Sequence, residues 1–494
     1  MNIEQIIKFC EPLKISGDKP AKMGKLCQDS REVVEGDIFI AVKGYKSDGH
    51  NFIQEAVERG ASVVIAEKEI TGVDGVMILQ VKNTRKLLGP LAQFIAGNPA
   101  QKLTIIGVTG TNGKTTVCTL IWQALTKLGY KASLLGTVEK RVNQEEFKSR
   151  LTTADPIELS YDMRQMVEAG SEYLVMEVSS HALSQERVRG IPFKVAVFTN
   201  LSHDHLDYHK SMNEYASAKK KLFSSLDDKS WAVTNLDDSR GEWITNTTPA
   251  KILSFSFKAK GLFKAELISA GVEGSVIMLD DIKIKTPLVG LFNAYNVIEA
   301  LLACTALGLD GRHLSEILSV CNGAPGRMER VNLASKTVKE PLVFVDYAHT
   351  PNALENVAST LNHLKSPNQK LVIIFGCGGD RDKTKRPVMA EIAEEIADKV
   401  IVTSDNPRTE DPDSIIDDIM RGFKNRKPVT RITSRQNAIT KTILEADINS
   451  IVLIAGKGHE TYQEINGVRT HFDDREVALD ALKEWKLQNK ERVG

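Results

Sequence analysis

Short apolar runs separated by segments of helical periodicity fill the N-terminal part of the chain. Residues 37–41 (DIFIA), 62–66 (SVVIA) and 76–80 (VMILQ) predict short buried strands. Between the first two, residues 52–60 (FIQEAVERG) have helical spacing and end on Gly60, a residue that commonly stops a helix. The pattern predicts a first α/β unit that closes near the loop at 97–99 (GNP).

The same alternation continues through the rest of the sequence. Further strands are expected at 103–110, 173–178, 195–201, 341–347, 370–376, 399–405 and 450–456. Strands that are apolar throughout and alternate with helices indicate parallel sheets covered on both faces. We therefore expect an α/β protein of three domains: an N-terminal α/β domain (1–99), a central P-loop ATPase-like domain with a mostly parallel sheet (100–330), and a C-terminal Rossmann-like, doubly wound domain (331–494).

The composition of the chain argues against several classes of protein. Lys plus Arg equals Asp plus Glu at 64 each, so the basic excess typical of a nucleic-acid binder is missing. The six cysteines form no CxxC pair, which argues against a zinc knuckle or a disulfide framework. The sequence has neither a signal-peptide pattern nor a stretch of ~20 apolar residues, so we expect a cytoplasmic protein without a transmembrane segment.

Residues 107–116 (GVTGTNGKTT) follow a predicted strand and precede a helix, which is the setting of a phosphate-binding loop. Glycines let backbone N–H groups approach an anion, a lysine reaches the terminal phosphates, and a hydroxyl binds Mg²⁺. The spacing departs from the strict Walker pattern at Val108, and a Gly-rich turn with a chance lysine is the alternative. The predicted ATP-binding residues are Gly110, Thr111, Asn112, Gly113, Lys114, Thr115 and Thr116.

Polar clusters follow two later strands. Glu177 ends the strand at 173–178, and residues 200–209 (NLSHDHLDYH) contain three histidines and two aspartates. The density suits coordination of a hard cation, with Mg²⁺ favoured over zinc beside an ATP loop. The alternative for His203 and His209 is a structural bond to backbone carbonyls.

From these motifs a family resemblance emerges. The form TGTNGKT resembles the ATP loop of Mur ligases and folylpolyglutamate synthases, and EVSSHAL…NLSHDHLDYH is similar to the Mur ligase central domain. The resemblance implies that Thr115 and Glu177 hold one Mg²⁺ and His205 a second. It also implies that Lys219, in the stretch YASAK, is carbamylated by CO₂ to N6-carboxylysine and serves as a metal ligand. The alternative is an ordinary surface lysine in the run AKKKLF.

The resemblance assigns further residues to ATP and to a UDP-linked precursor. Asn293 and Asn296 would lie by the nucleotide, although helix capping is the alternative for an asparagine that opens a helix. Arg327 resembles a hinge arginine that approaches the terminal phosphate, and Asp346 and His349 would contact ATP from the third domain. The implied precursor-binding residues are Ser30, Thr152, Thr153, Ser179, Gln185 and Arg187, with Ala154 replacing the family's usual proline.

The stretch Asp405-Asn406-Pro407-Arg408 resembles the MurE type of Mur ligase, which adds meso-diaminopimelate. Relatives that add lysine usually lack this arginine. A guanidinium binds a carboxylate through two parallel hydrogen bonds, so an arginine suits the second carboxylate of diaminopimelate. The resemblance adds Arg381, Gly456 and Glu460, the last for the distal ammonium. Residues 376–381 (GCGGDR) do not fit a dinucleotide loop, and we expect no redox cofactor.

The resemblance as a whole implies an ATP-dependent amide ligase of peptidoglycan precursor synthesis. It would add meso-diaminopimelate to UDP-N-acetylmuramoyl-L-alanyl-D-glutamate through an acyl phosphate, with Mg²⁺. Lys114, Arg327, His205 and carbamylated Lys219 would carry the chemistry. The open alternatives are a lysine-adding ligase, a folylpolyglutamate synthase-like ligase and a nucleotide-driven switch without ligation. We expect a monomer.

Overall fold

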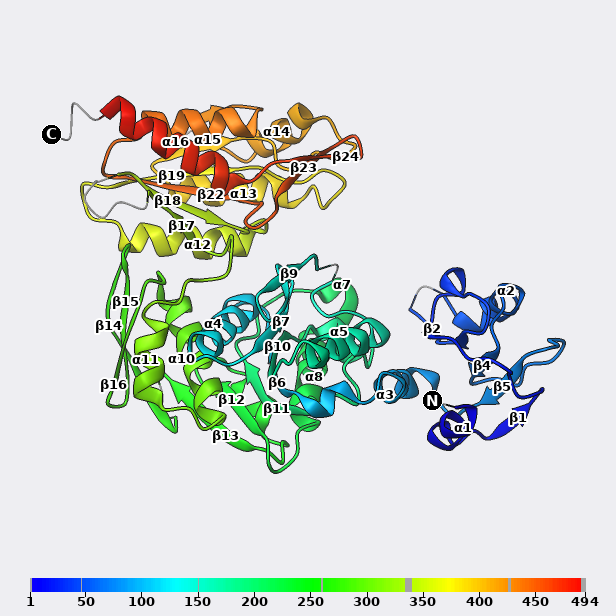
Figure 1. The fold of residues 1–494 in the computed structure, drawn as a ribbon. Helices are drawn as coiled ribbons and strands as arrows, with labels where there is room; N and C mark the ends of the chain where they lie inside the picture. Colours follow the sequence, from blue (N-terminus) through cyan, green and yellow to red (C-terminus); the bar gives the residue numbers. More distant parts are fainter. Residues whose placement is uncertain are drawn as a thin grey trace. The chain divides into compact units, whose positions relative to one another are not determined.

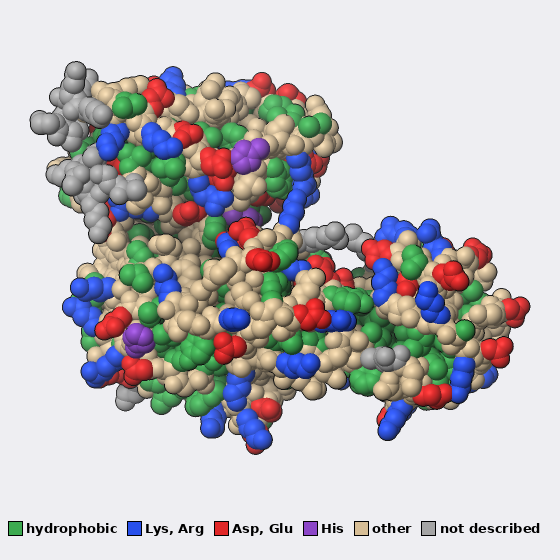
Figure 2. Space-filling model, in the orientation of Figure 1, with side chains coloured by type: hydrophobic (Ala, Val, Ile, Leu, Met, Phe, Trp, Pro, Cys, Tyr) green, Lys and Arg blue, Asp and Glu red, His purple; other side chains and the backbone are tan. Residues whose placement is uncertain are grey.

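The computed structural model describes residues 2–45, 47–149, 151–258, 261–333, 340–424 and 428–489. The chain divides into two compact units, Met1–Phe263 with Glu299–Asp310, and Lys264–Ile298 with Gly311–Gly494 (Figure 1). Among the described residues, no helix is both long and apolar enough to cross a bilayer. On the face drawn in Figure 2, side chains of both charge signs are interspersed.

The first unit begins with a five-stranded sheet in the order β1-β5-β4-β3-β2. Strands β2 (Leu26–Cys27), β3 (Ile38–Ile40), β4 (Val63–Ala66) and β5 (Met77–Gln80) are parallel, and β1 (Lys14–Ser16) is antiparallel to β5. Helices α1 (Ile3–Cys10) and α3 (Thr84–Ile95) pack on one face and α2 (Ile53–Glu58) on the other. Alternate residues of the four parallel strands enter two separate cores, which explains why these strands are largely apolar.

The same unit holds a larger sheet around β6 (Thr104–Thr109). Its parallel strands run in the order β13 (Lys251–Ser256), β12 (Trp231–Asn235), β11 (Phe193–Phe198), β6, β10 (Tyr173–Glu177) and β7 (Ala132–Leu135). Antiparallel β8 (Lys140–Val142) and β9 (Glu145–Phe147) extend it. Its helices are α4 (Lys114–Lys127), α5 (Pro156–Glu168), α6 (Ser180–Ser184), α7 (Leu206–His209), α8 (Met212–Ser224) and α9 (Gly241–Thr245). Because β6 is central, the ends of β10 and β11 flank the loop that follows it.

In the second unit, β14 (Phe263–Gly271), β15 (Gly274–Leu279) and β16 (Ile282–Thr286) form antiparallel hairpins. Helices α10 (Leu291–Ala306) and α11 (Gly311–Leu318) follow, and the division between the units falls within α10. Asn293 therefore lies inside the first turn of α10, so the interpretation that it opens and caps the helix is wrong. Its side chain instead donates to the Val289 carbonyl (2.9 Å).

The C-terminal sheet has the order β17-β18-β22-β19-β20-β21. Strands β18 (Leu342–Asp346), β22 (Ser450–Ala455), β19 (Lys370–Phe375), β20 (Lys399–Val402) and β21 (Val429–Arg431) are parallel, and β17 (Glu329–Val331) is antiparallel. Helices α12 (Pro351–Leu364), α13 (Lys385–Ile396) and α14 (Pro412–Met420) cover one face, and α15 (Arg435–Glu445) and α16 (Asp474–Asn489) cover the other (Figure 1). The doubly wound arrangement is confirmed. A hairpin of β23 (Tyr462–Ile465) and β24 (Val468–His471) follows β22.

Candidate active site

The loop between β6 and α4 has the geometry of an anion-binding turn. Gly113 has φ +85°, and a Cβ at Gly110 would lie 1.8 Å from the Thr199 hydroxyl oxygen, so both positions require glycine. Helix α4 begins at Lys114, whose Nζ donates to the carbonyls of Gly110 (3.1 Å) and Thr111 (2.8 Å). The loop thus presents backbone N–H groups and one ammonium at a helix N-terminus, as binding of a polyphosphate requires.

The loop after β11 fastens this turn, a feature that the sequence did not reveal. The Asn112 N–H donates to Asn200 Oδ1 (3.0 Å), and the Thr199 hydroxyl donates to the Asn112 carbonyl (2.6 Å). The Ser202 N–H donates to the Thr111 hydroxyl (3.0 Å). Thr116 is buried in the first turn of α4. The polar residues after one strand therefore fix the phosphate loop after its neighbour.

Glu177 is fully buried at the end of β10 and faces the phosphate loop. Its Oε1 accepts hydrogen bonds from the Thr115 hydroxyl (3.0 Å) and the Thr137 N–H (2.8 Å), and its Oε2 accepts from the Thr137 hydroxyl (3.0 Å). A Cβ at Gly136 would lie 2.8 Å from Oε1. A hydroxyl and a carboxylate in contact are the hard oxygen donors that Mg²⁺ prefers, so this pair fits the ion. Sequence reasoning missed Thr137 and Gly136.

Lys219 is buried (1% exposed), so the surface-lysine alternative is wrong. Its Nζ donates to the Gly110 carbonyl (2.7 Å) and lies 4.5 Å from the centre of the Tyr215 ring. Burial, and secondarily Lys114, lower the pKa of Lys219 well below its usual value. A lowered pKa raises the fraction of neutral amine, which is the form that reacts with CO₂.

In the histidine-rich segment at 203–209, the rings of His205 and His209 both lie near the ring of His181, with ring centres 4.9 and 5.6 Å from it. His209 is buried and its Nε2 is bonded to the Ser180 hydroxyl (2.9 Å), which agrees with a structural role for this residue. His203 and His205 are exposed, and His205 has φ +52°. In the described part of the chain, no three His, Cys, Asp or Glu side chains group to hold a metal ion. The assignment of His205 to a metal ion stays a prediction.

The predicted precursor-binding residues around β10 are brought together. The Thr153 hydroxyl donates to the Glu177 carbonyl (2.9 Å) and accepts from the Ser179 N–H (3.1 Å). Arg187 donates to the Thr153 carbonyl (2.8 Å) and, through two nitrogens, to Gln185 Oε1 (2.9 and 2.7 Å). The Thr152 and Thr137 hydroxyls are hydrogen-bonded to each other (2.9 Å). This network is continuous with Glu177 and hence with the phosphate loop.

In the N-terminal sheet, the Ser30 hydroxyl donates to Glu55 Oε2 (2.9 Å) at the start of a short 3-10 helix, Ser30–Glu32. The same domain has a cavity of about 270 Å³ that the sequence did not indicate. Its lining residues are Lys43, Gly44, Tyr45, Glu67, Asn83 and Arg85. Two of these are cationic, which suits a phosphate-bearing ligand.

In the second unit, the Asp346 carboxylate accepts the N–H groups of Met328 (2.6 Å) and Ala348 (2.7 Å). It thereby ties the end of β18 to the segment that carries Arg327, whose guanidinium carbon lies 4.8 Å from the centre of the Tyr347 ring. His349 Nδ1 is bonded to the Tyr347 carbonyl (2.9 Å). On α10, the Asn296 amide donates to Asn293 Oδ1 (3.0 Å), so these predicted nucleotide residues form a pair.

The predicted amino-acid residues lie on loops that follow β19, β20 and β22, where a doubly wound sheet binds its ligands. Asn406 is buried and links two of the loops, since its amide donates to Glu460 Oε2 (2.7 Å) and its oxygen accepts from Lys457 Nζ (3.2 Å). Gly456 has φ +122°, and a Cβ there would lie 2.6 Å from Asp405 Oδ2. Burial raises the pKa of Glu460. Sequence reasoning missed Lys457, although it lies within the quoted GKGHE stretch.

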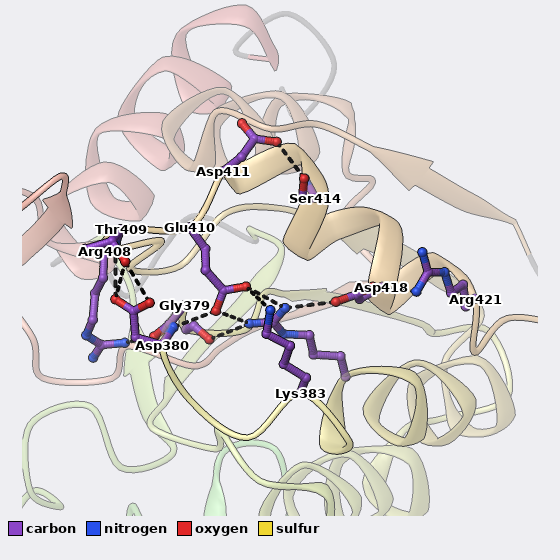
Figure 3. Close-up of polar contacts among 12 residues, drawn as sticks. Gly379, Asp380, Lys383, Arg408, Thr409, Glu410, Asp411, Ser414, Asp418 and Arg421 are labelled. Atoms are coloured by element: carbon purple, nitrogen blue, oxygen red, sulfur yellow. Dashed lines mark hydrogen bonds and ion pairs between the residues drawn. The ribbon is translucent and has the colours of Figure 1, made fainter.

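Arg408 is half-buried and has the left-handed φ of +54°. Its Nη1 donates to the Gly379 carbonyl (2.7 Å), on the loop after β19 (Figure 3). Its own N–H donates to the Glu464 carbonyl of β23 (3.0 Å). Arg381 is exposed on the loop after β19, and its Nη1 donates to the neighbouring Asp380 carbonyl (3.3 Å). Two arginines, an acid and an amide therefore line the edge of this sheet.

Comparison with known proteins decides the family. Three domain models match the chain: Mur ligase family, catalytic domain (25–95); Mur ligase middle domain (108–304); and Mur ligase, glutamate ligase domain (326–458). A UDP-N-acetylmuramoyl-L-alanyl-D-glutamate–2,6-diaminopimelate ligase from Cytophaga hutchinsonii is 42% identical over 486 residues, or 98% of this chain and 99% of that protein. The chain belongs to the Mur ligase family.

Further relatives and solved structures agree with this family assignment. The ligase of the same name from Geobacillus kaustophilus is 42% identical over 468 residues, covering 92% of this chain and 94% of that protein. A solved structure bearing this name is 34% identical with a TM-score of 0.71, covering 97% of this chain and 98% of the other. A Mycobacterium tuberculosis folylpolyglutamate synthase shares the fold at 20% identity, with a TM-score of 0.57 over 76% of this chain and 92% of its own. The expected three-domain α/β class is confirmed.

Proposed function

We propose that this Mur ligase joins meso-diaminopimelate to UDP-N-acetylmuramoyl-L-alanyl-D-glutamate at the expense of ATP. The observation that carries the proposal is Arg408, held beside Asp405, Asn406 and Glu460 at the ends of β20 and β22, in a chain that is similar over its full length to diaminopimelate ligases. A cationic and an acidic group at one sheet edge suit an amino acid with a second carboxylate and a distal ammonium.

In the first step, a carboxylate oxygen of the D-glutamate attacks the γ-phosphorus of ATP, and ADP leaves. The phosphate loop supports this step because Lys114 and the N–H groups of its helix neutralise charge on the phosphate oxygens. Thr115 and Glu177 would hold one Mg²⁺, and His205 with carbamylated Lys219 a second; bound Mg²⁺ would supply further neutralisation of phosphate charge. Arg327 is proposed to approach the terminal phosphate.

In the second step, the amino group attacks the acyl carbon, phosphate leaves, and a proton is released as the amide forms. The precursor is proposed to lie along Thr152, Thr153, Ser179, Gln185 and Arg187, which the structure links to Glu177. We propose that the cavity beside Lys43 and Arg85 receives the precursor's nucleotide end. The proposed domain roles are precursor binding for 1–99, ATP binding for 100–330 and amino-acid binding for 331–494. A monomer working in the cytoplasm, where ATP is available, completes the proposal.

The test is release of ADP by the full chain with ATP, Mg²⁺ and the precursor, against a panel of amino acids. We expect release with diaminopimelate and a product whose mass equals the two joined substrates minus water. Preference for lysine would replace the amino-acid assignment, and ADP release that ignores amino acids would favour a nucleotide switch. Lys114→Ala is the control for contaminating ATPases, since it removes the loop ammonium.

A further inference from the structure

Arg386 is a fully buried arginine that the ligation reaction does not explain. It lies on α13, and its side chain is 1% exposed. Its two terminal nitrogens donate to both carboxylate oxygens of Glu410 (2.9 and 3.1 Å), and Nη1 also donates to Asp418 on α14 (2.9 Å). Nη2 further approaches the Gly378 carbonyl (3.4 Å). A guanidinium that is removed from water needs such pairing, so its geometry is tightly fixed.

Glu410 connects this arginine to two loops that carry predicted amino-acid ligands. Figure 3 shows Glu410 with Asp380 and Lys383 beside it. It belongs to the loop after β20, and its Oε1 accepts the N–H of Asp380 in the loop after β19 (2.6 Å). Lys383 approaches its other oxygen (3.0 Å). The Arg386 guanidinium lowers the pKa of Glu410 to about 2, so the carboxylate is charged at neutral pH. Glu410 therefore fastens the two loops to each other and to α13.

A second set of hydrogen bonds also joins the loop after β19 to the loop after β20. The Asp380 carboxylate accepts both the N–H (3.2 Å) and the hydroxyl (2.8 and 2.9 Å) of Thr409, which is exposed. The Gly379 N–H donates to the Asn406 carbonyl (2.9 Å). A Cβ at Gly379 would lie 1.9 Å from the Pro407 carbonyl oxygen, so the loops approach as closely as a glycine permits. The Gly379 carbonyl is thereby placed by both sets of bonds.

That carbonyl is the group that holds the Arg408 guanidinium (2.7 Å). The backbone of Arg408 is fixed independently by β23 and the turn after it, through its N–H to Glu464 (3.0 Å) and its carbonyl to the Asn466 N–H (2.6 Å). The direction of the side chain consequently depends on the loop after β19. Displacement of this loop would turn the guanidinium away without disturbing the backbone that carries it.

We propose that Arg386 is a positioning residue for amino-acid selection, acting through Glu410 and the Gly379 carbonyl to aim Arg408 at the second carboxylate of a diamino dicarboxylic acid. The inference rests on the proposed function, because it assumes that Arg408 reads that carboxylate. It adds to the residues that select the amino acid one that does not touch the substrate.

The test compares Arg386→Lys with the unaltered enzyme. Lysine keeps one charge but loses the two-pronged grip, so the KM for diaminopimelate should rise about ten- to hundredfold, while the KM values for ATP and the precursor stay within about twofold. The control is Arg421→Lys, because Arg421 pairs with the same Asp418 (2.7 Å) but is 75% exposed. It should change none of the three KM values.

The double variant Arg386→Lys/Arg408→Ala separates positioning from general stabilisation. If Arg386 acts through Arg408, the double variant should use diaminopimelate no worse than Arg408→Ala alone. If Arg386→Lys does not fold, Thr409→Val serves instead. Among the described residues, the hydrogen bonds seen for the exposed Thr409 hydroxyl go to the Asp380 carboxylate in the other loop. This variant should raise the diaminopimelate KM about fivefold, the loss expected for one hydrogen bond.

Equal changes in all three KM values, an unchanged KM for diaminopimelate, or full additivity in the double variant would overturn the inference. These outcomes leave the proposed function standing as long as the unaltered enzyme ligates diaminopimelate. Failure of the unaltered enzyme to do so would instead overturn the proposed function.

Discussion

Replacing Arg408 with alanine should remove most of the selectivity for diaminopimelate over lysine. The residue has φ +54°, and alanine in that position bears the same left-handed backbone cost as arginine. The N–H and carbonyl that join Arg408 to the turn at Glu464–Asn466 are retained. The substitution is therefore a truncation of the guanidinium with the loop left in place.

The magnitude follows from the environment of the side chain. Removing one partner of a buried charge pair costs ~2–5 kcal/mol. Arg408 is half-buried, so the lower part of this range applies, and about 2–3 kcal/mol corresponds to a loss of about 30- to 150-fold in kcat/KM for diaminopimelate. Lysine has no second carboxylate, and its kcat/KM should change by less than about threefold.

The assay is coupled ADP release with each amino acid at saturating ATP and precursor. Arg469→Ala is a matched control, because Arg469 pairs with Glu464 on the neighbouring hairpin (2.8 Å) and is 57% exposed. The control should retain the selectivity of the unaltered enzyme. If Arg408→Ala weakens both amino acids equally, Arg408 does not read the second carboxylate, and the assignment of diaminopimelate loses its main support.

Three further predictions concern the phosphate loop, the buried lysine and the C-terminal core. Lys114→Ala should abolish ligation while the free energy of unfolding in urea changes by less than ~1 kcal/mol; turnover near the unaltered rate would contradict the loop assignment. Lys219→Ala should be nearly inactive and partly rescued by short carboxylates, and ¹³C-bicarbonate should label Lys219 in the unaltered enzyme; an unlabelled lysine in active enzyme would refute carbamylation. Arg435→Met leaves the fully buried Asp474 without its partner (2.6 Å) and should lower the free energy of unfolding by ~3–5 kcal/mol, whereas Arg431→Met, in a partly exposed pair, should change it little. Equal effects of these two arginine variants would show that burial of the pair does not matter.

The sheets and the phosphate loop could be read from the sequence because their signals are local. Residues 103–110 predicted a buried strand before a glycine turn, and β6 (Thr104–Thr109) has the partners that this implies. The antiparallel strands β14 to β16 were not predicted, because only alternate residues are buried and the segment carries many charges. Asn293 shows the limit of capping rules, since α10 begins two residues earlier at Leu291.

The residues that hold the site together could not be predicted, because burial and pairing are properties of the tertiary structure. Arg386 and Arg435 look like surface charges in their helical segments, yet both are buried: Arg386 is bonded to Glu410 in the loop after β20, and Arg435 to the last carbonyl of β22. Thr137 gives no signal in the sequence but bonds Glu177 twice. The family resemblance identified the residues proposed to contact substrates. The residues that support them, such as Arg386 and Thr137, could be identified only from the structure.

In the proposed reaction, ATP activates the D-glutamate carboxylate as an acyl phosphate before the amide forms. The most direct measurement uses precursor with ¹⁸O in both oxygens of that carboxylate, unlabelled ATP, and mass spectrometry of the released phosphate. We expect one ¹⁸O in each phosphate, because the attacking oxygen stays bonded to phosphorus when the amine displaces it, and one ¹⁸O in the amide carbonyl. Unlabelled phosphate, with amide formed at the normal rate, would contradict the proposed reaction.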